Sequence, residues 1–186
     1  MKLIAGLGNA GGEYAGTRHN VGFDFLDYIS GRLRLKFDKK NKLAVCCRKN
    51  IKGADTIFIK PLTYMNLSGE AVGFFSQKYK IPARDMLIVH DDIDLPLYKV
   101  KIKKGGGDAG HKGVKSVIES LGSGGFARLR VGVGRPELKG GACDYVLGEM
   151  DGKEQKEFVK VFKDMEDFVM NFIHMGYEKA AGRFRG

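Results

Sequence analysis

The 186-residue chain lacks several features that mark particular classes of protein. It has no tryptophan, only four prolines and three cysteines, and no apolar run that approaches the length needed to span a bilayer. Cys46, Cys47 and Cys143 have neither metal-ligand spacing nor the even number of a disulfide framework. We therefore expect inert free thiols, no bound metal and a cytoplasmic location.

Acidic residues are in the minority. The chain has 32 Lys and Arg against 22 Asp and Glu, which gives a formal net charge of +10. An excess of this size favours a polyanionic partner, most often nucleic acid. By itself it does not identify one, because many basic proteins bind no nucleic acid.

Apolar periodicity predicts strands that alternate with helices. Strands are expected at residues 2–8, 43–47, 56–60, 86–89, 98–103 and 129–133. Helical spacing begins near Val21, at Asn66 or Ser68, near Val114 and near Phe158. Asn20 is placed to cap the first of these helices. The pattern predicts one α/β domain over residues 1–186, with a twisted, mostly parallel central sheet flanked by helices on both faces.

Polar segments follow three of the predicted strands, at residues 9–18, 61–66 and 91–94. Open α/β sheets bind ligands at the carboxyl ends of their strands. We therefore expect one site built from several separated loops.

Two glycine-rich segments are similar to nucleotide-binding motifs. Residues 6–11 match G-x-G-x-x-G, but that motif needs a helix to open at once, and residues 12–20 intervene before helical spacing starts. Residues 104–112 lack the Lys-Ser/Thr ending of a P-loop. A nucleotide-dependent oxidoreductase is rejected on these grounds.

The four histidines differ in their sequence context. His174 falls late in the last helix, where a surface position is expected, and His90 at a strand end is open to a structural or a functional role. His19 lies in a polar loop between a buried strand and a helix, where side chains face clefts. Its alternative role is to cap the helix that follows. A neutral imidazole at this position could take a proton from water if a carboxylate oriented it, and Asp91 is among the candidates.

No G-x-S-x-G nucleophile elbow is present, and no cysteine has an activating context. Direct attack by a His-activated water is therefore the simpler chemistry. Asn9 and Asn66 follow other strand-like segments, and their amides suit an acyl substrate because they can donate to carbonyl oxygens and accept from N–H groups.

Five separated stretches carry a family resemblance. They are residues 6–9 with Tyr14 and 17–22, residues 61–69, residues 90–96, residues 105–107 with 110–113, and residues 128–136. In this order they resemble the bacterial-type peptidyl-tRNA hydrolases over residues 2 to about 150, and the C-terminal helix also fits. The resemblance implies a monomer that hydrolyses the ester between peptide and tRNA without metal or cofactor.

The resemblance also implies roles for the polar residues. It implies that His19 is the base that activates water and that Asp91 keeps it in its basic form. Asn9 resembles the residue that reads the peptide backbone and rejects aminoacyl-tRNA with a free amine, and Asn66 the residue that positions the peptide and the water. Substrate-binding and tRNA-binding roles are implied for Tyr14, Tyr64, Met65, His111, Lys112, Lys103 and Arg130, the last two as a clamp on the 5′ phosphate at the acceptor end.

Two positions depart from the family's pattern. Ala10 stands where the family usually has proline, and Lys112 stands where it has asparagine. An ammonium donates but cannot accept, so Lys112 adds a charge near the site and is expected to reach a 3′-end phosphate or a carbonyl oxygen. The alternative function is a catalytically inactive RNA-binding relative of the same fold. Against it, a pure binder has no use for a base and carboxylate pair.

Overall fold

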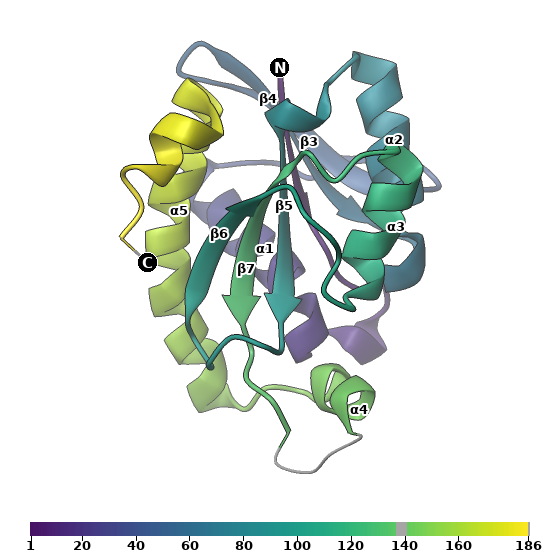
Figure 1. Cartoon of the computed structure of the whole chain (residues 1–186), viewed down its shortest axis with the longest axis vertical. Coiled ribbons are helices and arrows are strands. Elements are labelled where there is room, and N and C mark those ends of the chain that lie inside the picture. Colours follow the sequence, from purple (N-terminus) through teal and green to yellow (C-terminus); the bar gives the residue numbers. More distant parts are fainter. Residues whose placement is uncertain (137–140, 186) are drawn as a thin grey trace.

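A computed structural model, which describes residues 1–136 and 141–185, places a seven-stranded sheet between two layers of helices (Figure 1). The strands are β1 (Lys2–Gly6), β2 (Lys39–Lys40), β3 (Ala44–Ile51), β4 (Ala54–Pro61), β5 (Met86–Asp92), β6 (Val100–Lys104) and β7 (Ala127–Gly132). The α-helices are α1 (Val21–Leu33), α2 (Ser68–Tyr79), α3 (Lys112–Leu121), α4 (Ala142–Leu147) and α5 (Gly152–Ala181). None of these helices is long and apolar enough to cross a membrane.

The sheet is parallel in its centre and antiparallel at both edges. Its strand order is β2-β3-β4-β1-β5-β7-β6, and the pairings of β1 with β4, β1 with β5 and β5 with β7 are parallel. The pairings β2–β3, β3–β4 and β6–β7 are antiparallel. The expected α/β class is confirmed, and the carboxyl ends of four parallel strands meet at one end of the sheet.

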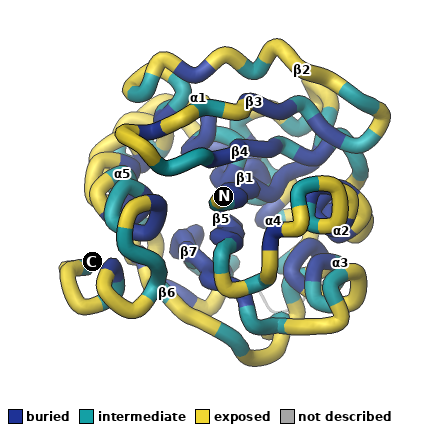
Figure 2. The backbone as a smooth tube through the Cα atoms, turned by 90° about the horizontal axis from the view of Figure 1, so that it is seen from above, coloured by how far each residue is buried: buried dark blue, intermediate teal, exposed yellow. Residues whose placement is uncertain are grey.

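Two hydrophobic layers hold the helices against the sheet. On one face, α1 and α5 pack around seven phenylalanine, methionine and isoleucine side chains from these helices, which are Phe25, Ile29, Phe158, Phe162, Met165, Phe168 and Phe172. On the other face, α2 and α3 bury residues such as Val72, Phe75, Val114 and Val117. Figure 2 shows the buried strands in the middle and the exposed helix faces outside them. Burial of both sheet faces explains the nearly continuous apolar runs of β1 and β5.

The glycines of the apparent nucleotide motif serve packing. A Cβ added to Gly6 would lie 2.2 Å from the carbonyl oxygen of Gly22, and one added to Gly22 would lie 2.6 Å from the carbonyl oxygens of Leu7 and Val89. These glycines therefore let the start of α1 approach the strands closely. The 3-10 turns Gly12–Tyr14 and Arg18–Asn20 precede α1, so no helix opens directly after the motif.

Most predicted elements are present in the structure, although their ends shift by a few residues, and there are three differences. Strand β2 was not predicted, because two lysines carry no apolar pattern. The side chain of Asn20 makes no capping hydrogen bond to α1, so the expected cap is wrong. It bonds instead to the backbone of Asn9, a contact distant in sequence. Helix α4 was not predicted, because six residues carry too little periodicity.

Candidate active site

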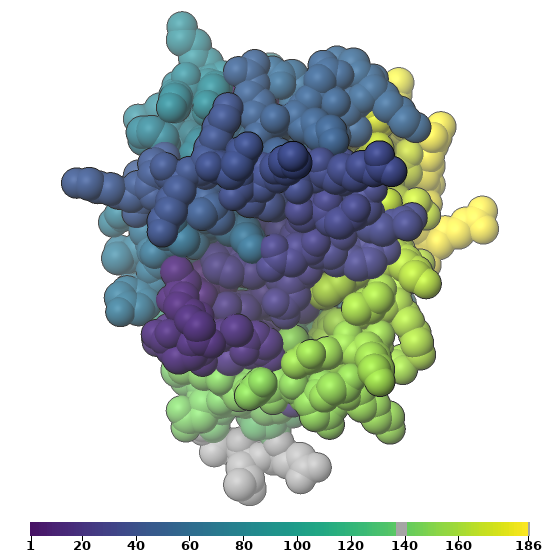
Figure 3. Space-filling view, turned by 180° about the vertical axis from the view of Figure 1, so that it is seen from behind, coloured from purple at the N-terminus to yellow at the C-terminus, as the bar shows by residue number. Residues whose placement is uncertain are grey.

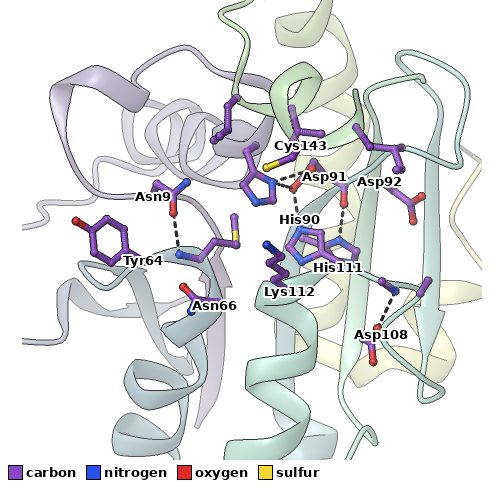
Figure 4. A pocket seen from close by; sticks show the side chains of 18 residues that line it. Asn9, Tyr64, Asn66, His90, Asp91, Asp92, Asp108, His111, Lys112 and Cys143 are labelled. Carbon is purple, nitrogen blue, oxygen red and sulfur yellow. Dashed lines mark hydrogen bonds and ion pairs between the residues drawn. The ribbon is translucent and has the colours of Figure 1, made fainter. Parts of the chain in front are cut away.

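A cavity of about 690 Å³ opens at the carboxyl ends of the parallel strands (Figure 4). Polar side chains from four loops or strand ends line it, and they are Asn9, His19, Tyr64, Asn66, His90, Asp91, Asp92, Asp108, His111 and Lys112. Eight predicted site residues thus meet in one place: Asn9, His19, Tyr64, Met65, Asn66, Asp91, His111 and Lys112. They come from parts of the chain up to 100 residues apart, because the parallel strands deliver their following loops to one end of the sheet.

Asp91 lies at the centre of the polar cluster. Its carboxylate contacts Nδ1 of His19 at 2.9 and 3.0 Å and Nε2 of His111 at 2.8 Å. The side chain of Asp91 is 2% exposed, whereas that of His19 is 14% exposed. The carboxylate is therefore largely withdrawn from solvent, although both side chains line the cavity.

The hydrogen bonds assign the protons of the two imidazoles. Nδ1 of His111 caps α3 by accepting from the backbone N–H groups of Gly113 and Val114, each at 3.1 Å. The ring proton of His111 must then be on Nε2, which donates to Asp91. His19 donates to the same carboxylate from Nδ1, and among the described residues no protein group bonds to its Nε2. That nitrogen is left with a free lone pair.

The charge of Asp91 is stabilised by these neighbours. Burial alone would raise the pKa of this carboxyl, but the attraction of His111 and the hydrogen bonds from His111 and His19 outweigh burial. The pKa of Asp91 therefore lies well below its ordinary value. An ionised carboxylate at this position orients His19 and favours a positive charge on its ring.

His90 is the third histidine of the cluster. Its Nδ1 donates to the carbonyl oxygen of Asp91 at 2.6 Å, and its ring packs edge-on against His111 with centroids 4.7 Å apart. Its Nε2 is buried and has no partner among the described residues. Burial in the protein interior lowers the pKa of His90 to about 3, because it penalises the charged form. His90 is therefore a neutral wall of the site, and the sequence had left its role open.

Asn9 is held in one orientation. Asn20 bonds to both the N–H and the carbonyl of Asn9, at 2.8 and 3.0 Å, and the backbone N–H of Met65 donates to Oδ1 of Asn9 at 2.7 Å. Figure 4 shows the oxygen turned away to this bond. Because Oδ1 is occupied, Asn9 presents its Nδ2 to the cavity, as a donor.

Helix α4 supplies an apolar wall that sequence analysis missed. Ala142, Val146 and Leu147 line the cavity opposite the polar cluster, together with Ile93 and the free thiol of Cys143. Figure 4 shows the Cys143 side chain directed into the cavity. The proline and glycine that follow β7 gave no sign that the chain returns to the site.

Arg18 joins the loop of His19 to the distant C-terminal helix. Its guanidinium binds both carboxylate oxygens of Glu154 at 2.7 and 2.8 Å and lies 4.6 Å from the ring centroid of Tyr145. The neighbouring Thr17 forms a β-bridge to Glu149. These contacts fix the backbone on either side of His19, and no local pattern in the sequence indicated them.

Three predicted site residues lie outside the cavity. Tyr14 is half-buried in a 3-10 turn, and Lys103 is exposed on β6 opposite Arg128. Arg130 donates to Asp92 at 2.6 Å. The structure therefore does not bring Lys103 or Arg130 to the cluster around Asp91, and Arg130 already has an acidic partner in Asp92.

Within the described part of the chain, one group of side chains has the spacing of metal ligands, and it consists of His19, Asp91 and His111. Each can offer one ligand atom, and these atoms lie within 4.8 Å of one another. However, Nε2 of His111 carries the ring proton as long as Nδ1 caps α3, so it has no lone pair for a metal. The three side chains fit a hydrogen-bonded relay better than an ion site.

Comparison with known proteins gives a consistent result. The family model described as peptidyl-tRNA hydrolase matches residues 3–186. A peptidyl-tRNA hydrolase from Geotalea daltonii is 40% identical over 96% of this chain and 93% of its own, and one from Clostridium novyi is 39% identical over 100% and 98%. The crystal structure of the Acinetobacter baumannii peptidyl-tRNA hydrolase superimposes with a TM-score of 0.87 at 36% identity, over 93% of this chain and 88% of that one.

Proposed function

The chain belongs to the peptidyl-tRNA hydrolase family, and we propose that it hydrolyses the ester between peptide and tRNA by attack of a water molecule that His19 activates, without a metal ion. One observation carries this mechanism. Asp91 holds Nδ1 of His19, while Nε2 of the same ring is left with a free lone pair at the cavity.

The reaction needs one proton to move twice. Nε2 of His19 takes a proton from water as the water oxygen attacks the ester carbonyl carbon, and the imidazolium that forms is stabilised by Asp91. When the tetrahedral intermediate collapses, the bond to the ribose oxygen breaks and that oxygen receives the proton. The side chains of Asn66 and Lys112 line the same cavity and can donate hydrogen bonds to the developing oxyanion.

Asn9 accounts for selection of N-blocked substrates. Its Nδ2 at the cavity wall is a donor, so it pairs with a peptide carbonyl oxygen, which an aminoacyl ester with a free amine does not have. A protonated amine at this position would face another donor. The apolar wall formed by α4 contacts peptide side chains without reading their identity.

Contacts to tRNA are expected from the basic residues around the site. Lys103 is free to bind a phosphate, whereas Arg130 would have to keep or exchange its bond to Asp92. Tyr64, 64% exposed beside the cavity, offers a ring for stacking on a base at the 3′ end. Affinity that depends on phosphate contacts should fall steeply with salt.

Single-turnover release of peptide from N-acetylated aminoacyl-tRNA tests the proposal. We expect release that is unchanged by a chelator and absent with free aminoacyl-tRNA. Loss of release on chelation would show a required metal. No release under any condition, with tRNA still bound, would instead identify the inactive RNA-binding alternative.

A further inference from the structure

One short segment carries most of the net charge of this protein. Residues 31–53 contain nine of the 32 Lys and Arg but only one of the 22 Asp and Glu, and so account for +8 of the formal +10. The segment runs from the end of α1 through β2 and β3 to the turn before β4. The charge that first suggested a polyanionic partner is therefore concentrated away from the β6 lysines.

Most cations of this segment are exposed and have no acidic partner. Arg32 and Arg48 form ion pairs with Glu166 and Asp55, and Lys49 donates to backbone carbonyls of residues 33 and 34. The remaining six are exposed and have no ion pair among the described residues: Arg34, Lys36, Lys39, Lys40, Lys42 and Lys52. Unpaired charges at this density repel one another, so a bound polyanion would relieve the repulsion.

Three of these lysines lie at the same end of the sheet as the cavity. Lys39 and Lys40 pair with the start of β3, which in turn pairs with the last residues of β4, and Lys42 follows in the same turn. The carboxyl end of β4 leads directly to Tyr64 and Asn66. Figure 2 places β2 at the outer edge, opposite β6, and Figure 3 shows side chains of this part of the chain projecting from the rear surface. At about 4.8 Å per strand, β2 lies about 19 Å across the sheet from β5.

Two simpler explanations for the exposed cations, protection of a sheet edge and attraction to a membrane, do not explain all of them. Lysines on an edge strand prevent pairing with other sheets, but β2 has two residues and the unpaired cations extend well beyond it. A membrane surface would also attract positive charge. However, none of the large exposed apolar side chains in the described residues belongs to this segment, so nothing there would insert into lipid.

We propose that the exposed cations of residues 34–42 form a second RNA-binding surface, which contacts phosphates in the body of the substrate tRNA beyond its acceptor end. Exposed cations on β2 and the turns beside it suit backbone phosphates and no particular base sequence, because the one ring of the segment, Phe37, packs against the core. The inference rests on the proposed function for the identity of the RNA.

The test compares two double variants with equal changes of charge. Lys39→Glu/Lys40→Glu alters the proposed surface, and Lys156→Glu/Lys163→Glu alters two exposed lysines of α5 that also have no ion pair in the described structure. Dissociation constants and kcat/KM are measured against salt, with a full-length N-acetylated aminoacyl-tRNA and with a minihelix of the acceptor stem. Glutamate keeps the edge charged, so edge protection is preserved in the variant.

For the β2 variant we expect binding of full-length tRNA to weaken at least about tenfold at low salt and the salt slope to fall by about two units. Minihelix cleavage and single-turnover rates at saturation should stay at wild-type values. Equal losses with the minihelix, or equal losses in the α5 variant, would overturn the proposal. A wild-type protein that binds tRNA but releases no peptide would refute the proposed function and leave the binding comparison intact.

Discussion

The loop after β1 and the first turn of α3 each bring one histidine to Asp91, and the two rings differ at their second nitrogen. Nε2 of His19 has no hydrogen-bond partner within residues 1–136 and 141–185, while the second nitrogen of His111 accepts from two backbone N–H groups of α3. The same residue type on the same carboxylate is therefore suited to act as a base in one place and as a structural donor in the other. The two rings differ because backbone N–H groups at the start of α3 occupy the second nitrogen of His111 and do not reach that of His19.

The largest effect expected from this comparison is in the His19→Ala variant. Removal of the proposed base should lower single-turnover peptide release by roughly 10²–10⁴-fold. Affinity for deacylated tRNA should remain near the wild-type value, because His19 offers no charge contact to the RNA. An equal loss of tRNA affinity would show that His19 binds substrate instead of activating water.

Two substitutions of His111 separate its cap from its bond to Asp91. His111→Asn keeps a side chain that caps helices well but is too short to reach the carboxylate, so we expect about tenfold slower turnover and nearly unchanged stability. His111→Ala loses both and should in addition be about 1 kcal/mol less stable to urea. If His111→Ala slowed the reaction as much as His19→Ala, the assignment of different roles to the two rings would be wrong.

The buried His90 makes stability depend on pH. Its pKa is lowered to about 3 in the folded protein. Between about pH 6.5 and 3, the unfolded chain therefore binds a proton at His90 and the folded protein does not. Stability should therefore fall as pH drops from about 6.5 to 3, by up to about 1.4 kcal/mol per pH unit for this one group. His90→Asn, which keeps a donor for the Asp91 carbonyl, should flatten this slope in urea titrations at several pH values. An unchanged slope would place the acid sensitivity elsewhere.

The smallest effect is expected at Lys112, on the α3 side of the cavity. Figure 4 shows its side chain directed into the cavity, where it makes no protein hydrogen bond among the described residues. Lys112→Asn should raise KM a few-fold and lower the salt slope by at most about one unit, with kcat retained, because one phosphate or carbonyl contact is lost. A loss in kcat comparable to that of His19→Ala would make Lys112 part of the catalytic apparatus.

Much of this contrast was predictable, and some was not. The periodicity of β1 and β5 placed Asn9 and Asp91 at strand ends, where loops converge, whereas His111 was expected at the site only from the family resemblance. The tautomers were not predictable, because they depend on whether Gly113 and Val114 aim their N–H groups at a ring nitrogen. Helix α4 was missed for a similar reason, since its apolar residues gain their role only by packing over the cavity.

The sequence alone determined the α/β class, the approximate places of most elements, the net positive charge and the set of side chains able to do acyl chemistry. These follow from local periodicity and residue type, which act over a few neighbouring positions. Tertiary structure decided the orientation of Asn9 through Asn20 and Met65, the anchoring of Arg18 by Glu154, and the concentration of unpaired cations at the edge formed by β2. Each depends on partners that folding brings together across the chain, and local periodicity carries no information about such contacts.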